Sequence, residues 1–212
     1  MCLSLRSSPA LESVADVAHD DSGNVWISDG DGGVNNRVVQ LKNDSSYSVA
    51  HVIDGTHGAG AFSSPHSIAW QRQGDLIWVA DRGNNRTQTF RASDGSFVGQ
   101  WTCFRDIDGT DGSVAPIAPW GLRIDQERNE LIMAADTGAG KRGHLLRLDL
   151  SAAMEAAAAG DRNAFEASCN IAQDIEIGAS AKSHEVAIDQ ANGDVYLANL
   201  GVPSNVLKFM RV

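Results

Sequence analysis

The sequence predicts an all-β protein in which four copies of one small antiparallel sheet follow one another along the chain. Two observations predict this fold. The same succession of apolar strand, tight turn, second strand, Gly- or Asn-rich connection and third strand occurs four times, over residues of about 13–53, 64–102, 118–150 and 182–212. The copies also recur at nearly even spacing. Short strands with Gly and Asp turns at this period are typical of propeller blades, so we expect one β-propeller domain over 1–212, with about four four-stranded blades.

Equivalent positions in the four repeats can be aligned at the start of the first strand of each. They are occupied by Ala15, His66, Trp120 and His184, with spacings of 51, 54 and 64 residues. Each repeat has three clear strands, and the segments 46–53 and 96–101 add a fourth strand to the first two repeats. Two histidines therefore recur at one position in alternate repeats, which core packing alone does not predict.

The long last spacing has a local cause in the Ala-rich segment 151–167. This segment opens on Ser151, which suits a helix N-cap, and it meets Gly160, which suits a helix end. We therefore expect one short helical insertion between the third and fourth repeats.

Closure of the ring of blades depends on the two ends of the chain. The last repeat stops after its third strand, while residues 2–6 (CLSLR) alternate apolar and polar side chains as a half-buried strand does. We expect this segment to supply the outer strand of the last blade. In the alternative, it belongs to a preceding blade that the chain does not contain, and the four repeats are part of a larger ring.

Charge and hydropathy exclude several classes of partner. The formal net charge is −10 at pH 7, and no basic stripe offsets it, so a phosphate backbone would be repelled and a nucleic-acid partner is not expected. No apolar run approaches the roughly 20 residues of a membrane span, and the first residues lack the apolar core of a signal peptide. We therefore expect a soluble chain without a membrane partner. The sequence predicts neither a cellular location nor an oligomeric state.

The three cysteines are few and far apart. Cys2, Cys103 and Cys169 form no C-x-x-C pair, so we expect neither a disulfide framework nor a thiolate zinc site, and the thiols are expected to be buried or idle.

The segment GDLIWVADRGNNRTQTF (74–90) resembles an NHL repeat, in which a strand is followed by an Asp-x-x-Asn-x-Arg pattern and another strand. The Asp and Arg of this pattern occur as Asp29 with Arg37 and as Asp81 with Arg86. We expect each pair to interact across the turn between neighbouring strands, which is a structural role and needs no catalysis.

Within the NHL group, the motifs SPHSIAW, VADRGNNR and SHEVAID are similar to the later blades of peptidyl-α-hydroxyglycine α-amidating lyases. These are six-bladed zinc enzymes that release a peptide amide and glyoxylate. The resemblance implies zinc, or another divalent metal, on His66 and His184. It also implies that Arg82 holds an anionic group of the substrate and that Glu185 is the candidate proton carrier. Strict side-chain alternation would turn Glu185 away from the channel if His184 points into it.

The sequence also departs from that family. The blades that carry its first zinc histidine and a further catalytic arginine have no counterpart, and Asp31 stands where the family has its active-site tyrosine. The cysteines that link the family's blades are Trp78 and Thr89 here, which is in keeping with a chain without disulfides. A metal held by two histidines keeps too many open positions for tight binding.

Three functions therefore stay open. The chain is a metal-dependent lyase or hydrolase acting on a small or peptide-derived substrate in the channel, a non-catalytic propeller that binds a peptide or protein on one face, or a degenerate lyase homologue. The loop 106–113 (DIDGTDGS) adds a candidate calcium site, although its spacing misses the EF-hand register. The other four histidines follow no repeat rule and are expected to lie at the surface or in packing. They are His19, His51, His57 and His144.

Overall fold

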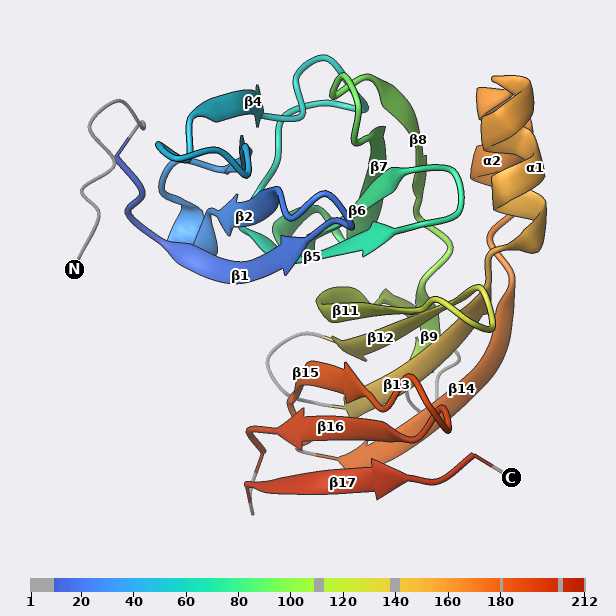
Figure 1. The fold of residues 1–212 in the computed structure, drawn as a ribbon. Coiled ribbons are helices and arrows are strands. Elements are labelled where there is room, and N and C mark those ends of the chain that lie inside the picture. The colour runs from blue at the N-terminus through green and yellow to red at the C-terminus, as the bar shows by residue number, and fades with distance from the viewer. Residues whose placement is uncertain (1–9, 109–112, 138–141, 180, 202–203, 212) are drawn as a thin grey trace.

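In the described part of the chain, four antiparallel sheets of three or four strands follow one another in an arc (Figure 1). The computed structural model describes residues 10–108, 113–137, 142–179, 181–201 and 204–211. The first sheet holds β1 (Val14–His19), β2 (Val25–Asp29), β3 (Arg37–Leu41) and β4 (Val49–Ile53). The second holds β5 (Pro65–Gln71), β6 (Leu76–Asp81), β7 (Arg86–Arg91) and β8 (Phe97–Trp101). Strands are thus paired in sequence order within each sheet, as expected for propeller blades.

The remaining two sheets continue the arc. The third holds β11 (Ala118–Asp125), β12 (Glu130–Asp136), β13 (Arg142–Asp149) and β14 (Ile171–Ala179). The fourth holds β15 (Ser183–Ile188), β16 (Val195–Asn199) and β17 (Asn205–Phe209). The first strands of the four blades contact one another in the order β1, β5, β11 and β15, so they form the inner side of the arc. The predicted all-β propeller fold is confirmed.

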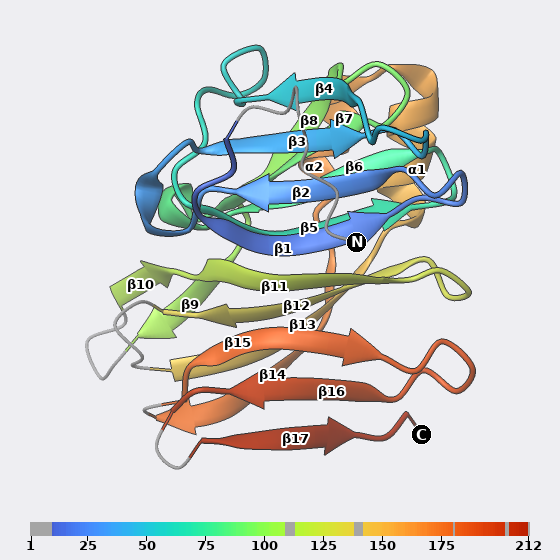
Figure 2. The same ribbon diagram turned by 60° about the vertical axis from the view of Figure 1, so that its left-hand side comes forward.

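Two details differ from the expected blades. The fourth sheet has three strands within the described residues, and the segment 2–6 that was expected to add a fourth lies outside them. The first and fourth sheets lie at opposite ends of the arc in both views (Figures 1 and 2). A small hairpin of β9 (Arg105–Asp108) and β10 (Ser113–Pro116) also follows the second blade, and the sequence did not predict it. The side chains of the candidate calcium loop lie outside the described part of the chain.

Apolar side chains between neighbouring blades form the core. β6 is buried along its whole length because a core lies against each of its faces. Trp78 belongs to the cluster between the second and third blades, whereas Ile77 and Val79 belong to the cluster between the first and second. This explains why the LIWVA run is apolar at every position and does not alternate.

The two predicted Asp–Arg pairs are present between the second and third strands of the first two blades. Arg37 Nε lies 3.0 Å from Asp29 Oδ2, and Arg86 Nε lies 2.6 Å from Asp81 Oδ2. Both aspartates are fully buried and each faces its arginine directly in the strand register. The pairs therefore hold the ends of the strands together, which is the structural role expected for them.

Neighbouring blades are joined by three side chains that follow the inner strands, and we call Arg72, Gln126 and Gln190 the latch residues. Gln126 donates to the carbonyl of Trp70 (2.7 Å) and accepts from the backbone N–H of Arg72 (3.0 Å). Gln190 repeats this one blade later, donating to the carbonyl of Ile124 (3.0 Å) and accepting from the N–H of Gln126 (3.1 Å). Each amide thus bonds two backbone groups at the end of the preceding inner strand.

The second blade is latched to the first by a charged pair instead of an amide. Arg72 Nε lies 2.8 Å from Asp21 Oδ2. Asp21 and the three latch residues are spaced by 51, 54 and 64 residues, the same intervals as the strand-start positions. The latch is therefore a feature of the repeat, in which the residue type changes and the position does not.

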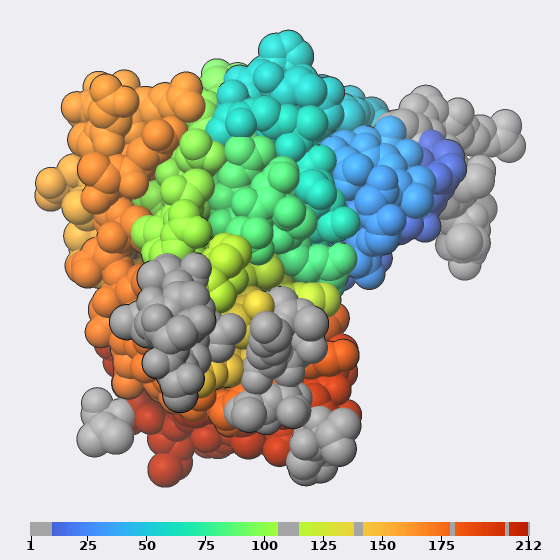
Figure 3. Space-filling view, turned by 180° about the vertical axis from the view of Figure 1, so that it is seen from behind, coloured from blue at the N-terminus to red at the C-terminus, as the bar shows by residue number. Residues whose placement is uncertain are grey.

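The insertion after the third blade's third strand contains two helices where one was expected. α1 (Ser151–Ala159) ends at Gly160, whose φ of 68° is the left-handed C-cap predicted for it. The predicted N-cap is shifted by one residue: Leu150 occupies the N-cap position, Ser151 is the first helical residue, and its hydroxyl donates to the Asp149 carboxylate. α2 (Arg162–Ala167) contacts β8, and the two helices lie beside the second blade in front and rear views (Figures 1 and 3). Among the described residues, no helix is long and apolar enough to cross a membrane.

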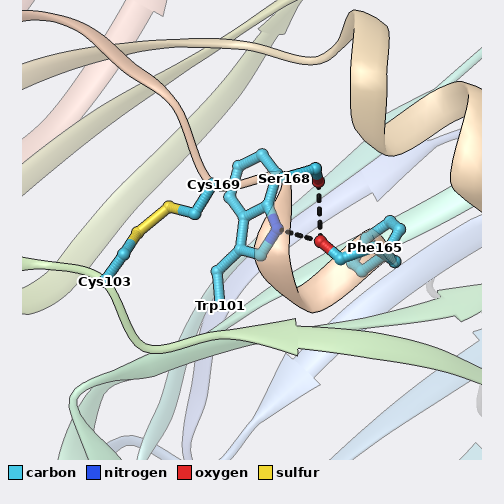
Figure 4. Close-up of a disulfide and its surroundings, with 5 residues drawn as sticks. All are labelled: Trp101, Cys103, Phe165, Ser168 and Cys169. Atoms are coloured by element: carbon cyan, nitrogen blue, oxygen red, sulfur yellow. Dashed lines mark hydrogen bonds between the residues drawn. A yellow bond between two sulfur atoms is a disulfide. The ribbon is translucent and has the colours of Figure 1, made fainter. Parts of the chain in front are cut away.

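The insertion is fixed to the second blade by a disulfide and by aromatic contacts. Phe165 of α2 packs on Trp78 and Trp101, and the indole of Trp101 donates to the Phe165 carbonyl at 2.9 Å. Next to these contacts, Cys103 and Cys169 form a disulfide with their Cα atoms 6.4 Å apart (Figure 4). The prediction of idle thiols was therefore wrong for this pair. The cysteines lie 66 residues apart in sequence, and only the return of the chain after α2 brings them together.

Candidate functional site

Each inner strand is interrupted by a β-bulge near its start. The ladder with the second strand skips Ala15 in β1, Trp120 in β11 and His184 in β15. In β5 the irregularity spans His66 and the residue after it. These are the four positions that the sequence repeats aligned. A bulge releases a residue from the ladder and re-aims its side chain, so the same local device acts at the start of every blade.

The bulges bring three rings together on the inner side of the arc. The ring centroids of His66 and His184 are 4.9 Å apart, and the Trp120 ring lies 5.0 Å from His66 and 5.1 Å from His184. His66 is buried, and its Nδ1 lies 2.9 Å from the backbone carbonyl of Trp120. Because a carbonyl only accepts, the proton of a neutral His66 is on Nδ1 and its lone pair is on Nε2.

Arg82 completes this group from the turn that follows β6. Its guanidinium carbon lies 4.2 Å from the Trp120 ring centroid, a cation–π contact. Its Nη2 lies 3.1 Å from Oδ1 of Asp31, which is in the turn after β2. We call Asp31, His66, Arg82, Trp120 and His184 the histidine–arginine site. All four blades contribute to it.

Burial and charge decide the protonation of the two histidines. Burial lowers the pKa of His66 and of His184 below the ordinary histidine value, and the Arg82 charge lowers both pKa values further. The Asp31 carboxylate acts in the opposite direction on both. The imidazoles are therefore neutral near pH 7, and Arg82 is the cation of the site.

Glu185, the expected proton carrier, lies in a separate cluster of polar side chains. Arg123 Nη1 lies 3.4 Å from Glu185 Oε1 and 2.8 Å from Asp16 Oδ2, and the Ser67 hydroxyl donates to Asp16 at 2.6 Å. We call Asp16, Ser67, Arg123 and Glu185 the axial polar cluster, because each inner strand supplies one member. Burial raises the pKa of Glu185 to about 7, with Arg123 opposing the rise and Asp16 adding to it.

Two features of the backbone allow Glu185 to reach this cluster. The bulge at His184 breaks the alternation of β15, so that His184 and Glu185 both contact residues of neighbouring inner strands. The facing residue of β11 is Gly121, where an added Cβ would lie 2.8 Å from the Cα of Glu185. The bulge therefore interrupts the alternation of side chains along β15, and Glu185 is not turned away from the neighbouring inner strands when His184 contacts them.

The donor atoms fit a metal ion in part. The Nδ1 of His66 bonds a backbone carbonyl, the orientation typical of a metal-ligating histidine. Within the described residues, however, no group of three or more His, Cys, Asp or Glu side chains is placed to hold a metal. A catalytic zinc site has three protein ligands. His66 and His184 would offer two at most, beside the Arg82 cation, so we assign no reaction step to a metal.

Sequence reasoning missed most of the axial polar cluster. Only Glu185 was singled out, although Asp16 and Ser67 follow their strand-start residues as Glu185 follows His184. An alignment of the four repeats shows this shared position directly. Arg123 does not share it, because the residue of β11 at that position is Gly121, and Arg123 reaches Asp16 and Glu185 from two residues further along the strand.

Comparisons with known proteins agree with the repeat pattern. The chain is 31% identical over 192 residues to NHL repeat-containing protein 3 of Homo sapiens and, at the same identity and length, to that of Mus musculus. The match covers 90% of this chain and 48% of each relative, so the chain spans about half the length of the curated relatives it matches. No protein-family profile matches it.

Solved structures show the same fold at low identity. One is a crystal structure of a putative 6-phosphogluconolactonase from Bacteroides uniformis, with a TM-score of 0.64 and 12% identity, covering 97% of this chain and 55% of that one. Another is a nidogen/laminin complex, with a TM-score of 0.58 and 15% identity, covering 92% and 60%. The chain is therefore a β-propeller whose repeats are similar in sequence to those of two NHL repeat-containing proteins.

Proposed function

We propose that the chain is a binding propeller whose histidine–arginine site receives an anionic group, such as a carboxylate, of a peptide or protein. The observation that carries this proposal is the position of Arg82. Its guanidinium lies on the Trp120 ring, beside two imidazoles that are neutral near pH 7. A guanidinium offers several N–H donors to a carboxylate, and its stacking on an aromatic ring fixes its orientation.

The ligand group follows from the chemistry of the side chains. The half-buried rings of Trp120 and His184 offer surface on which the apolar part of a peptide can pack, and Arg82 offers the charge. The loops that hold Asp31 and Arg82 come from neighbouring blades, so a ligand at this site would contact several blades at once. This arrangement favours recognition of an extended group over a single small ion.

The proposal can be tested with two small probes that differ only in charge. N-acetylglycine carries a carboxylate, whereas N-acetylglycinamide is neutral. We expect the carboxylate to shift the indole N–H resonance of Trp120 in a saturable NMR titration and the amide to bind at least tenfold more weakly. Arg82→Ala should abolish the saturable shift.

The matched control is Arg72→Ala. Arg72 also lies near a tryptophan, 5.9 Å from the Trp70 ring, and also pairs with an aspartate, Asp21. It follows the far end of β5, away from the histidine–arginine site. Equal binding of both probes, or equal loss of binding in both arginine variants, would contradict a carboxylate site at Arg82.

A second candidate is a metal-dependent lyase or hydrolase acting on a small or peptide-derived substrate. The proximity of the His66 and His184 rings and the lone pair on Nε2 of a neutral His66 favour it. In this candidate His66 and His184 would hold zinc or another divalent metal, which would supply Lewis-acid chemistry when bound. Arg82 holds the substrate anion, and Glu185, with its pKa near 7, carries a proton.

Metal content separates the two candidates. The second candidate expects stoichiometric metal in protein never exposed to a chelator, and its loss in the double variant His66→Ala with His184→Ala. His144→Ala serves as the control, because His144 lies on β13 and bonds Asp174 at 2.9 Å, outside the site. Wild-type protein that carries no metal and takes up none from micromolar zinc would exclude the metal-dependent candidate.

A further inference from the structure

We propose that Asp31 is a built-in competitor for the anionic ligand of Arg82, so that it sets the affinity of the histidine–arginine site. This inference rests on the proposed binding function. It assigns a role to the residue that replaces the tyrosine of the amidating lyases, and it concerns regulation of the site by the protein's own side chain.

The main chain holds Asp31 in place beside Arg82. The backbone N–H groups of Gly30 and Asp31 both donate to the carbonyl of Ser13, at 2.9 and 3.0 Å. Gly30 packs so closely on Pro65, at the start of β5, that an added Cβ would collide with the proline ring. The loop after β2 is therefore fixed against the second blade, and the Asp31 carboxylate meets the guanidinium without any movement of the backbone.

The ion pair of Arg82 differs from the structural Asp–Arg pairs of the same blades. Asp29 and Asp81, which pair with Arg37 and Arg86, are completely buried and also accept backbone N–H groups. The side chain of Asp31 is 49% exposed, whereas that of Arg82 is 19% exposed. The carboxylate can therefore rotate into water while the guanidinium stays stacked on its ring.

An exchangeable internal anion has a defined effect on binding. A pair with one half-exposed partner is weak, so a ligand carboxylate can replace Asp31 on the guanidinium. Until it is replaced, Asp31 occupies donors that the ligand needs, and its charge repels the ligand. The apparent affinity is reduced by the fraction of molecules in which Arg82 is engaged. Removal of the Asp31 charge should therefore tighten carboxylate binding by about three- to tenfold.

The test uses the wild-type chain, Asp31→Asn and Asp21→Asn, each titrated with N-acetylglycine and monitored at the Trp120 indole N–H. Asp21→Asn removes the same charge from an exposed pair, Asp21 with Arg72, beyond the opposite end of β1. We expect a lower Kd in Asp31→Asn and an unchanged Kd in Asp21→Asn. The gain should shrink at high salt, because the competing pair is partly exposed and is screened.

The outcomes separate this inference from the binding function itself. Saturable binding to wild type that is lost in Arg82→Ala but is no tighter in Asp31→Asn would overturn the competitor role and leave the binding function standing. Equal tightening in both asparagine variants would also overturn it, since net charge would then be the cause. No binding of N-acetylglycine to wild type or to Asp31→Asn would refute the binding function, and the competitor role with it.

Discussion

The imidazole rings of His66 and His184 come from the second and fourth blades and meet edge to face, with centroids 4.9 Å apart and planes at 87°. Both rings are buried or half-buried, and both sense the charges of Arg82 and Asp31. The pKa values of the two histidines therefore respond to the charges of both Arg82 and Asp31.

Removal of the Arg82 charge should raise the pKa of both histidines. Arg82 lowers both pKa values, since it penalises a second positive charge nearby, and Arg82→Ala removes that penalty. Asp31→Asn should act in the opposite direction, because the Asp31 carboxylate raises both pKa values. An NMR titration of the imidazole Cε1–H resonances measures the shifts directly. Unchanged midpoints in Arg82→Ala would contradict the described position of the guanidinium.

Glu185 should make stability fall as pH rises through neutrality. Its folded-state pKa of about 7 lies above the ordinary 4.5, so folding favours the protonated form. Its contribution is fully present below pH 4.5 and is lost as pH rises through 7. Wild type therefore loses this contribution between pH 5 and pH 8.5, whereas Glu185→Gln does not. The difference in unfolding free energy, variant minus wild type, should rise by roughly 1–3 kcal/mol over that range.

The exposed Glu127 offers a control for this experiment, as Glu127→Gln removes the same charge from the surface. Denaturant unfolding at the two pH values gives the comparison. If the difference in unfolding free energy between wild type and Glu185→Gln did not change with pH, Glu185 would titrate in its ordinary range.

The latch residues should stabilise the contact between blades. Gln126→Ala removes the hydrogen bonds to the Trp70 carbonyl and from the Arg72 N–H, which together should cost about 1–2 kcal/mol of unfolding free energy. Hydrogen exchange of the Arg72 amide should accelerate, since that N–H loses its acceptor. The control is Gln173→Ala at an exposed position of β14. If the Arg72 amide exchanged at the wild-type rate, the latch would not exist in solution.

The disulfide should hold the helical insertion on the second blade. The double variant Cys103→Ser with Cys169→Ser should lose about 2–4 kcal/mol, because the bond closes a loop of 66 residues. At this chain length that corresponds to a fall in Tm of about 4–16 °C. Cys2→Ser is the control and should melt as wild type does. A reducing agent should lower the Tm of wild type and of Cys2→Ser but not that of the double variant, and equal melting of wild type and double variant would argue against the bond.

Local features of the fold could be predicted from the sequence because they depend on short-range chemistry. The sequence predicted the equivalent strand-start positions, because each blade repeats the same turns and apolar strands. These positions are Ala15, His66, Trp120 and His184. The Asp81–Arg86 pair was readable for the same reason, as a hairpin places the two residues opposite each other. The end of α1 at Gly160 follows from the conformational freedom of glycine.

By itself, then, the sequence determined the repeat, the strand-start positions and the identities of His66, His184, Arg82 and Glu185 as residues of interest. Only the tertiary structure decided which of them share a site. Arg82 joins the two histidines through Trp120, whereas Glu185 joins Arg123 and Asp16. The Cys103–Cys169 bond was decided in the same way. The physical reason is that these contacts join different blades, so they depend on how sheets pack in space, and the spacing of residues along one strand does not encode that packing.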